Sequence, residues 1–188
     1  MDQQIFIIIP ANGKIKQLSQ TIVELLNSVP VAALLLSKGQ KLPEYESIAK
    51  QILPITKAHD CALLLDNEPV LAKKIGADGV HINGDIKLIK AALEELKPDL
   101  IVGAGNITNK HEAMEKGELG VDYVFFAKID ANEDNSLDLA NWWAQTFEVP
   151  AIYNIKNKNL NNNPQTEFLA FNFNDFSSAK EMIEFLSK

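Results

Sequence analysis

The sequence predicts a closed (β/α)₈ barrel, and two features of its pattern support that prediction. Eight short apolar runs alternate strictly with about seven segments of helical period. Most of the runs are continuously apolar, which is typical of parallel strands buried on both faces. Alternation of this kind indicates an α/β fold, and eight strands favour closure, although 188 residues is fewer than the usual ~250. An open doubly wound sheet is the alternative, but its phosphate loop is absent after the first run, and "GAGNIT" at 103–108 is only half of one.

The expected elements follow one another along the whole chain. The apolar runs predict strands at 5–9, 31–36, 61–66, 79–82, 100–103, 123–127, 150–153 and 168–171. Helices are predicted at 14–27, 43–53, 68–75, 86–96, 109–119, 136–147 and 175–187. Helix boundaries rest on local signals: Pro43 and Pro69 fit first turns, Ser136 fits an N-cap, and Gly76 fits a C-terminal cap.

One segment breaks the alternation. Residues 154–165 read "NIKNKNLNNNPQ" and have no apolar face, which predicts a loop. The loop stands where the seventh helix of a barrel would lie, so that helix is expected to be missing or reduced to a turn.

Composition limits the classes of function. The net charge of −7 argues against binding of nucleic acid or an anionic membrane. The longest apolar stretch, around Val29–Leu36, is too short to cross a bilayer. The single cysteine, Cys61, excludes an internal disulfide and fits a small core residue in a cytoplasmic protein. We expect one domain over residues 1–188.

The stretch from 61 to 85 resembles the thiamine phosphate synthase family, which includes a thiazole tautomerase branch. The family pattern is an apolar strand ending in Asn-Asp, a helix, Gly-Ala-Asp-Gly-Val-His-Leu, and then Gly-Gln-x-Asp. Residues 76–81, "GADGVH", match it one for one, and "VPAIYNI" at 149–155 lies where the family has Pro-x-x-Ala-Ile-Gly-Gly-Ile. The resemblance implies a (β/α)₈ barrel that couples an aminopyrimidine diphosphate to a thiazole phosphate, with Mg²⁺ bound and pyrophosphate released.

The resemblance also assigns site residues. Asp66 and Asp85 are the expected Mg²⁺ ligands, and Lys38, Asn67, Gly105 and Asn106 the expected substrate-binding residues. Each has a plainer alternative. Asp66 fits a solvated turn, Asp85 a helix N-cap, Lys38 an exposed loop lysine, and Gly105-Asn106 a simple turn. His81 is interpreted as a buried histidine with a satisfied hydrogen bond.

The sequence departs from the family at several strand ends. The Gln and Arg of the second strand align with Leu34 and Leu36, and the paired glycines after the seventh strand align with Tyr153-Asn154. The Asn-Asp of the third strand is reversed, the serine after the fifth is Gly105, and the acidic run 130–135 would repel a phosphorylated ligand. We therefore expect very weak or absent synthesis, with Lys128, Lys156 and Lys158 as the lysines that could compensate.

Two functions stay open from the sequence. The first is a divergent thiamine phosphate synthase acting on phosphorylated small molecules with Mg²⁺. The second is a non-catalytic barrel that binds a ligand or partner. The tautomerase reaction is a poorer option, because "GAGNIT" has no histidine where that branch carries its acid/base residue. One of Trp142 and Trp143 is expected to be buried, and the other is a candidate contact in a homo-oligomer.

Overall fold

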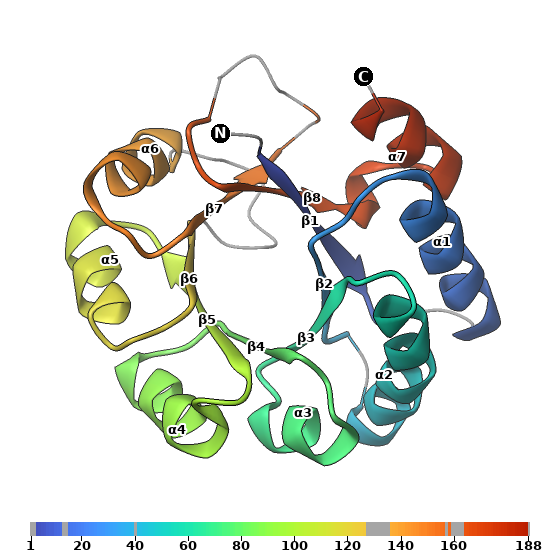
Figure 1. Cartoon of the computed structure of the whole chain (residues 1–188), viewed down its shortest axis with the longest axis horizontal. Helices are drawn as coiled ribbons and strands as arrows, with labels where there is room; N and C mark the ends of the chain where they lie inside the picture. The colour runs from blue at the N-terminus through green and yellow to red at the C-terminus, as the bar shows by residue number, and fades with distance from the viewer. Residues whose placement is uncertain are drawn as a thin grey trace.

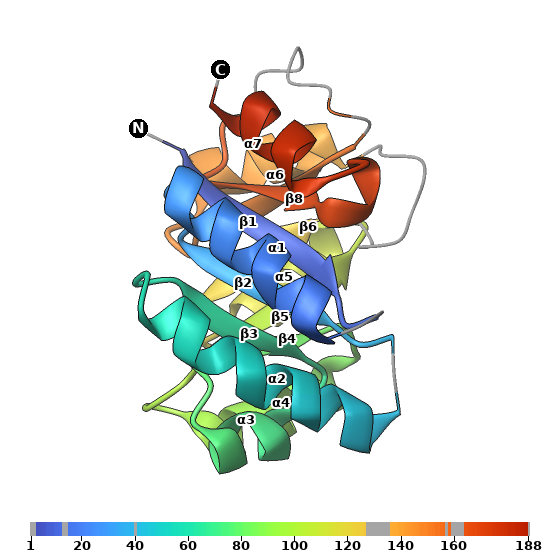
Figure 2. The ribbon, with the colours of Figure 1, turned by 90° about the vertical axis from the view of Figure 1, so that its right-hand side faces the viewer.

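The computed structural model describes residues 3–12, 15–39, 41–126, 136–156, 158 and 164–187. Its eight strands pair in parallel and in chain order, and the last pairs with the first to close a barrel (Figure 1). The closed (β/α)₈ prediction is confirmed, and the open sheet is excluded. Helices surround the strands, and because all strands run the same way their C-terminal ends meet at one face (Figure 2). No helix in the described part of the chain is long and apolar enough to cross a membrane.

The bounds of the elements are close to those predicted. The strands are β1 (Gln4–Pro10), β2 (Ala33–Ser37), β3 (Ala62–Asp66), β4 (Gly79–Ile82), β5 (Ile101–Ile107), β6 (Tyr123–Phe126), β7 (Ala151–Ile155) and β8 (Phe168–Asn172). The helices are α1 (Ile15–Ser28), α2 (Leu42–Lys57), α3 (Pro69–Ile75), α4 (Ile86–Leu96), α5 (Lys110–Gly117), α6 (Leu137–Thr146), α7 (Ala179–Leu186) and the short 3₁₀ helix η1 (Phe173–Asp175).

Three boundaries differ from the prediction for local reasons. Helix α2 continues one turn past residue 53, because Ile52 and Thr56 extend its buried face. Strand β5 runs on to Ile107 through a register shift against β6. Helix α7 begins late, because η1 follows β8 and the Ser178 side chain then caps α7 by accepting a hydrogen bond from the Glu181 amide.

The segment predicted as a loop at 154–165 is part strand. Asn154 and Ile155 belong to β7, where they pair with Ala170 and Phe171 of β8. No described residue between β7 and β8 is helical, as expected for the missing seventh helix, while residues 157 and 159–163 lie outside the described part of the chain. The acidic run 130–135 also lies outside it.

Side chains of the strands alternate between two apolar layers. One layer packs between the barrel and the helices, and the other fills the barrel interior. The inner layer consists of Phe6, Ile8, Ala33, Leu35, Leu64, Tyr123, Phe125, Ile152 and Ala170. Of the two phenylalanines in β6, Phe125 therefore points inward and Phe126 packs outward against buried Trp143. Because this alternation continues to the strand ends, it decides which residues face the mouth of the barrel.

Candidate functional site

The C-terminal mouth of the barrel is lined by small and polar side chains. Extending the inner faces of the strands other than β6 to their C-terminal ends brings Pro10 of β1 and six further residues to this mouth. The six are Ser37 of β2, Asp66 of β3, His81 of β4, Gly105 of β5, Asn154 of β7 and Asn172 of β8. Active sites of this fold form at this end of the barrel. Asp66 is the carboxylate among these residues.

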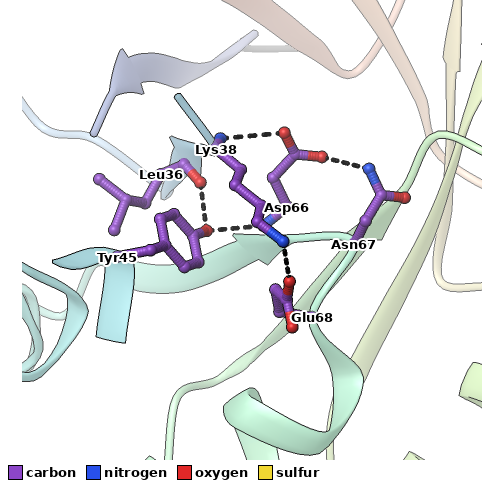
Figure 3. A network of polar contacts seen from close by, with 6 residues as sticks. All are labelled: Leu36, Lys38, Tyr45, Asp66, Asn67 and Glu68. Carbon is purple, nitrogen blue, oxygen red and sulfur yellow. Dashed lines mark hydrogen bonds and ion pairs between the residues drawn. The ribbon is translucent and has the colours of Figure 1, made fainter. Parts of the chain in front are cut away.

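Hydrogen bonds hold the Asp66 carboxylate in place. Its Oδ2 accepts from the backbone amide of Lys38 at 3.0 Å, and its Oδ1 accepts from Asn67 Nδ2 at 2.6 Å and Asn83 Nδ2 at 3.2 Å. Figure 3 shows the first two of these contacts. Asp66 is buried, so the interpretation as a solvated turn residue is wrong. Asn67 is fixed as well, because its Oδ1 accepts from the amide of Asn83 at 2.8 Å.

The backbone beneath Asp66 is fixed by a buried tyrosine of α2. The Tyr45 hydroxyl donates to the carbonyl oxygen of Leu36 at 2.5 Å and accepts from the amide of Asp66 at 2.9 Å (Figure 3). Burial raises the pKa of this hydroxyl well above its usual range, so Tyr45 stays protonated and neutral. The ends of β2 and β3 are thereby tied together.

Lys38 lies at the rim of this network. Its ammonium forms an ion pair with Glu68, at the start of α3 (Figure 3). The sequence predicted that Lys38 could hold a phosphate. In the structure its charge already has a carboxylate partner, and a phosphate would have to compete with Glu68 for it.

A relay of hydrogen bonds crosses the barrel interior to Asp66. His81 Nδ1 lies 2.9 Å from the Tyr123 hydroxyl, and His81 Nε2 lies 3.0 Å from Asn83 Oδ1. Asn83 donates through Nδ2 to Asp66, so its Oδ1 must accept from His81 Nε2–H, which leaves Nδ1 to accept from the tyrosine. His81 is fully buried, and desolvation lowers its pKa to about 4. The interpretation as a buried, satisfied histidine is confirmed.

Gly105 makes room for this relay. A Cβ at residue 105 would lie 2.3 Å from Asn83 Oδ1 and 2.4 Å from His81 Nε2, which is too close for any side chain. Asn106 follows with a φ of 53°, and its Nδ2 donates to the carbonyl of Asn83 at 3.3 Å. Substrate binding by Gly105 and Asn106 remains a prediction. Their contacts assign them a structural role.

A buried lysine supports the end of β5 from outside the barrel. Lys116 of α5 donates through Nζ to the carbonyl oxygens of Gly105 at 2.8 Å and Asn106 at 3.2 Å. Burial lowers the pKa of its ammonium. This contact was not predicted, because helical spacing alone does not show which lysine turns toward a strand end.

Asp85 caps α4, in agreement with the plainer of its two interpretations. Its Oδ1 accepts from the amide of Leu88 at 3.0 Å. No hydrogen bond links Asp85 to Asp66, and the described residues contain no group of three or more His, Cys, Asp or Glu side chains that could hold a metal. Mg²⁺ commonly takes one or two carboxylates and completes its shell with water and substrate phosphate. These residues therefore fit Mg²⁺ only together with a phosphorylated ligand.

The comparisons with known proteins agree with this geometry. A family model described as thiamine monophosphate synthase matches residues 5–163. The chain belongs to this family. It is 34% identical to a thiamine-phosphate synthase of Erythrobacter litoralis over 79% of this chain and 75% of that protein. Identity to the enzyme of Rhodospirillum centenum is 28% over 80% and 76% of the two chains.

A solved structure shows the same fold. The thiamine phosphate pyrophosphorylase of Pyrococcus furiosus superposes with a TM-score of 0.80 and 19% identity, covering 98% of this chain and 93% of that one. The family acts on phosphorylated small molecules in thiamine biosynthesis. The resemblance inferred from "GADGVH" is confirmed as family membership.

The structure shows which leucine of β2 faces the barrel interior. Sequence alignment placed the family arginine of the second strand at Leu36. Leu34 and Leu36 pack in the outer layer, and Leu35 is the residue whose side chain faces the interior. The alignment of the family arginine with Leu36 stays a prediction, because a run of three leucines gives no period-two signal that would show from the sequence which of them faces inward. The inward position is still apolar, and all 18 basic residues of the chain are lysines, so no arginine elsewhere replaces it.

At the end of β7, the two residues aligned with the paired family glycines point to opposite sides of the barrel wall, because side chains alternate along a strand. Tyr153 packs in the outer layer, whereas Asn154 occupies the inner face next to Ile152. Of the paired family glycines, only the second is thus replaced by a side chain that points into the barrel. Asn154 was expected in a loop and its burial was missed, because its neighbours in the sequence are so rich in asparagine.

The lysines expected to compensate are only partly described. Lys158 pairs with Glu181 of α7, and its ammonium lies 5.0 Å from the ring centre of Phe176. Lys156 also has an interaction partner, and Lys128 lies outside the described residues. Trp143 is buried as expected, while partly exposed Trp142 lies beneath the ammonium of Lys110 at 4.4 Å.

Proposed function

We propose that this chain is a thiamine phosphate synthase-like protein that binds phosphorylated precursors of thiamine at its C-terminal mouth and couples them far more slowly than an ordinary enzyme. One observation supports the slow rate above all others. Among the described residues, the inner side chains at the C-terminal strand ends are a proline, a carboxylate, neutral polar groups and a glycine, and none of them is cationic.

The chemistry explains why this matters. As pyrophosphate leaves, negative charge builds up on its oxygens, and the site must supply donors or cations where that charge develops. Removing one such donor commonly costs ~3 kcal/mol, or roughly a hundredfold to a thousandfold in rate. Here Leu35, the inward-facing leucine of β2, is apolar, and Lys38 is engaged by Glu68.

Mg²⁺ is the cofactor we assign to this reaction, with Asp85 and Asp66 as the residues that would hold it. Bound there, the ion would neutralise charge on the diphosphate. The Asn67 and Asn83 amides keep Asp66 in position, and Asp85 stands at the start of α4. The hydrogen bond from Leu88 occupies one of the roughly four lone pairs of the Asp85 carboxylate.

The test measures binding and turnover in one preparation. Purified protein with Mg²⁺ is titrated with the thiazole phosphate by calorimetry, and thiamine phosphate is then quantified with both substrates saturating. We expect measurable binding together with turnover well below ~1 per second, the lower end of the ordinary range. Binding with no product at all would make the chain a non-catalytic binding protein. Turnover in the ordinary range would contradict the proposal.

We also propose that the protein acts in the cytoplasm and forms a homo-oligomer. The free, buried Cys61 is in keeping with a reducing compartment. Trp142 is the surface aromatic residue that we assign to the oligomer contact.

A further inference from the structure

The amide of Asn154 is buried without a hydrogen-bond partner. The residue is 0% exposed, and neither its Nδ2 nor its Oδ1 finds a partner among the described residues. It lies on the inner face of β7, in register with Ala170 of β8, one inner position closer to the mouth than Ile152. Buried amides are nearly always paired, because leaving one unpaired opposes folding.

A neighbouring asparagine shows the ordinary arrangement. Asn172 lies on the inner face of β8, also buried, and its Oδ1 accepts from the amide of Asn174 at 3.0 Å. Two asparagines of the same size thus face the same interior from adjacent strands. Only the one on β8 has a structural hydrogen bond, so the fold itself gives no reason for an amide at residue 154.

We propose that Asn154 is a specificity-determining residue that pairs with a neutral ligand edge carrying a hydrogen-bond donor beside an acceptor. An amide offers a donor and an acceptor side by side, which matches an amide group or an amino group next to a ring nitrogen. A fully ionised phosphate group has acceptors for Nδ2 but no donor for Oδ1. The inference rests on the proposed function, because the ligand would occupy the same mouth.

The position of the residue also excludes the phosphate contact that the family resemblance implies at the end of β7. A glycine there lets backbone amides approach an anion closely. The inward side chain of Asn154 stands in that space, and the other inner groups described nearby, Asn172 and Ile152, carry no positive charge. The side chain of Asn154 is therefore suited to a neutral group rather than to a phosphate.

Full burial has a kinetic consequence. A ligand can reach Asn154 only after side chains at the mouth move apart, so its association should be slower than diffusional encounter. Rapid association would show that the amide is accessible by another route.

The experiment compares Asn154→Leu with its matched control Asn172→Leu, using 4-aminopyrimidine, pyrimidine and inorganic phosphate as probes. Leucine is close in shape to asparagine and has no polar atoms. We expect Asn154→Leu to keep or raise the melting temperature and to weaken 4-aminopyrimidine binding at least tenfold, with phosphate binding unchanged. Asn172→Leu should lower the melting temperature. Asn154→Ala repeats the binding test with a smaller side chain.

Several results would overturn the inference. One is a loss of stability in Asn154→Leu equal to that in Asn172→Leu, which would show that the amide is already satisfied. Others are an unchanged affinity for 4-aminopyrimidine, a wild-type protein that does not prefer it to pyrimidine, or a loss confined to phosphate. None of these measurements needs turnover, so rapid catalysis would contradict the proposed function and leave this inference standing.

Discussion

Acidification should destabilise the protein through His81 before it affects most carboxylates. The ring is fully buried and its pKa is about 4, against 6.5 for an ordinary histidine. Because the folded state binds this proton less readily, the unfolded state takes it up first as the pH falls. The stabilisation is complete above pH 6.5 and is lost between about pH 6.5 and 4.

The size of the effect follows from the two pKa values. At about 1.4 kcal/mol per pH unit, the interval between 6.5 and about 4 corresponds to about 3 kcal/mol of the free energy of unfolding. That is a large share of the ~5–15 kcal/mol typical of a domain. Carboxylates with lowered pKa values, such as Glu46 and Glu181 at about 2, begin to contribute only below their ordinary 4.5.

The assay is urea unfolding at several pH values between 7.5 and 4.5 for the wild type and for His81→Gln, which carries no charge at any of them. The wild type should lose stability progressively below pH 6.5, while the variant, less stable at neutral pH, should show a much flatter dependence. Equal slopes for the two proteins would show that His81 is not the source of the pH dependence. So would a pKa for His81 near 6.5 in an NMR titration of the folded protein.

Two further predictions concern the mouth of the barrel. Gly105→Ser should lower the free energy of unfolding by roughly 1–3 kcal/mol, because its Cβ would collide with Asn83 and His81. Adding Asn83→Ala should restore part of this stability. If urea unfolding shows that the effects of the two substitutions are simply additive, the predicted clash is absent. Asp85→Ala should cost ~1 kcal/mol as a lost N-cap and also abolish thermal stabilisation by Mg²⁺ with pyrophosphate. Asn109→Ala, which removes the N-cap of α5, is the control: it should lower the stability but keep the stabilisation by Mg²⁺ with pyrophosphate. If Asp85→Ala keeps that stabilisation too, the metal assignment is wrong.

Much of the fold could be predicted from sequence because the strands are buried on both faces. Runs such as "LLLD" at 63–66 mark a parallel strand whatever its neighbours are. The carboxylate at the end of β3 was visible for the same reason, since a polar residue that closes an apolar run lies at a strand end. Asp85 was also readable as a cap, directly before a helical segment.

The features of the site that could not be predicted from the sequence depend on which way side chains point. Leu34, Leu35 and Leu36 are chemically identical, so only the register with β1 and β3 shows that Leu35 faces inward. The relay from Tyr123 to Asp66 joins residues up to 57 positions apart (66 to 123), and no local pattern encodes it. The burial of Asn154 was not predicted, because the composition of residues 154–165 favoured a loop, although Asn154 continues the inner face of β7.

The most direct test of the proposed function is a single-turnover measurement. Protein in excess over the aminopyrimidine diphosphate, with saturating thiazole phosphate and Mg²⁺, is sampled over time for thiamine phosphate, so that the coupling step is observed without product release. We expect a rate constant far below ~1 per second, because none of the described inward-facing residues at the strand ends is cationic. A rate constant between ~1 and ~10³ per second would contradict this expectation.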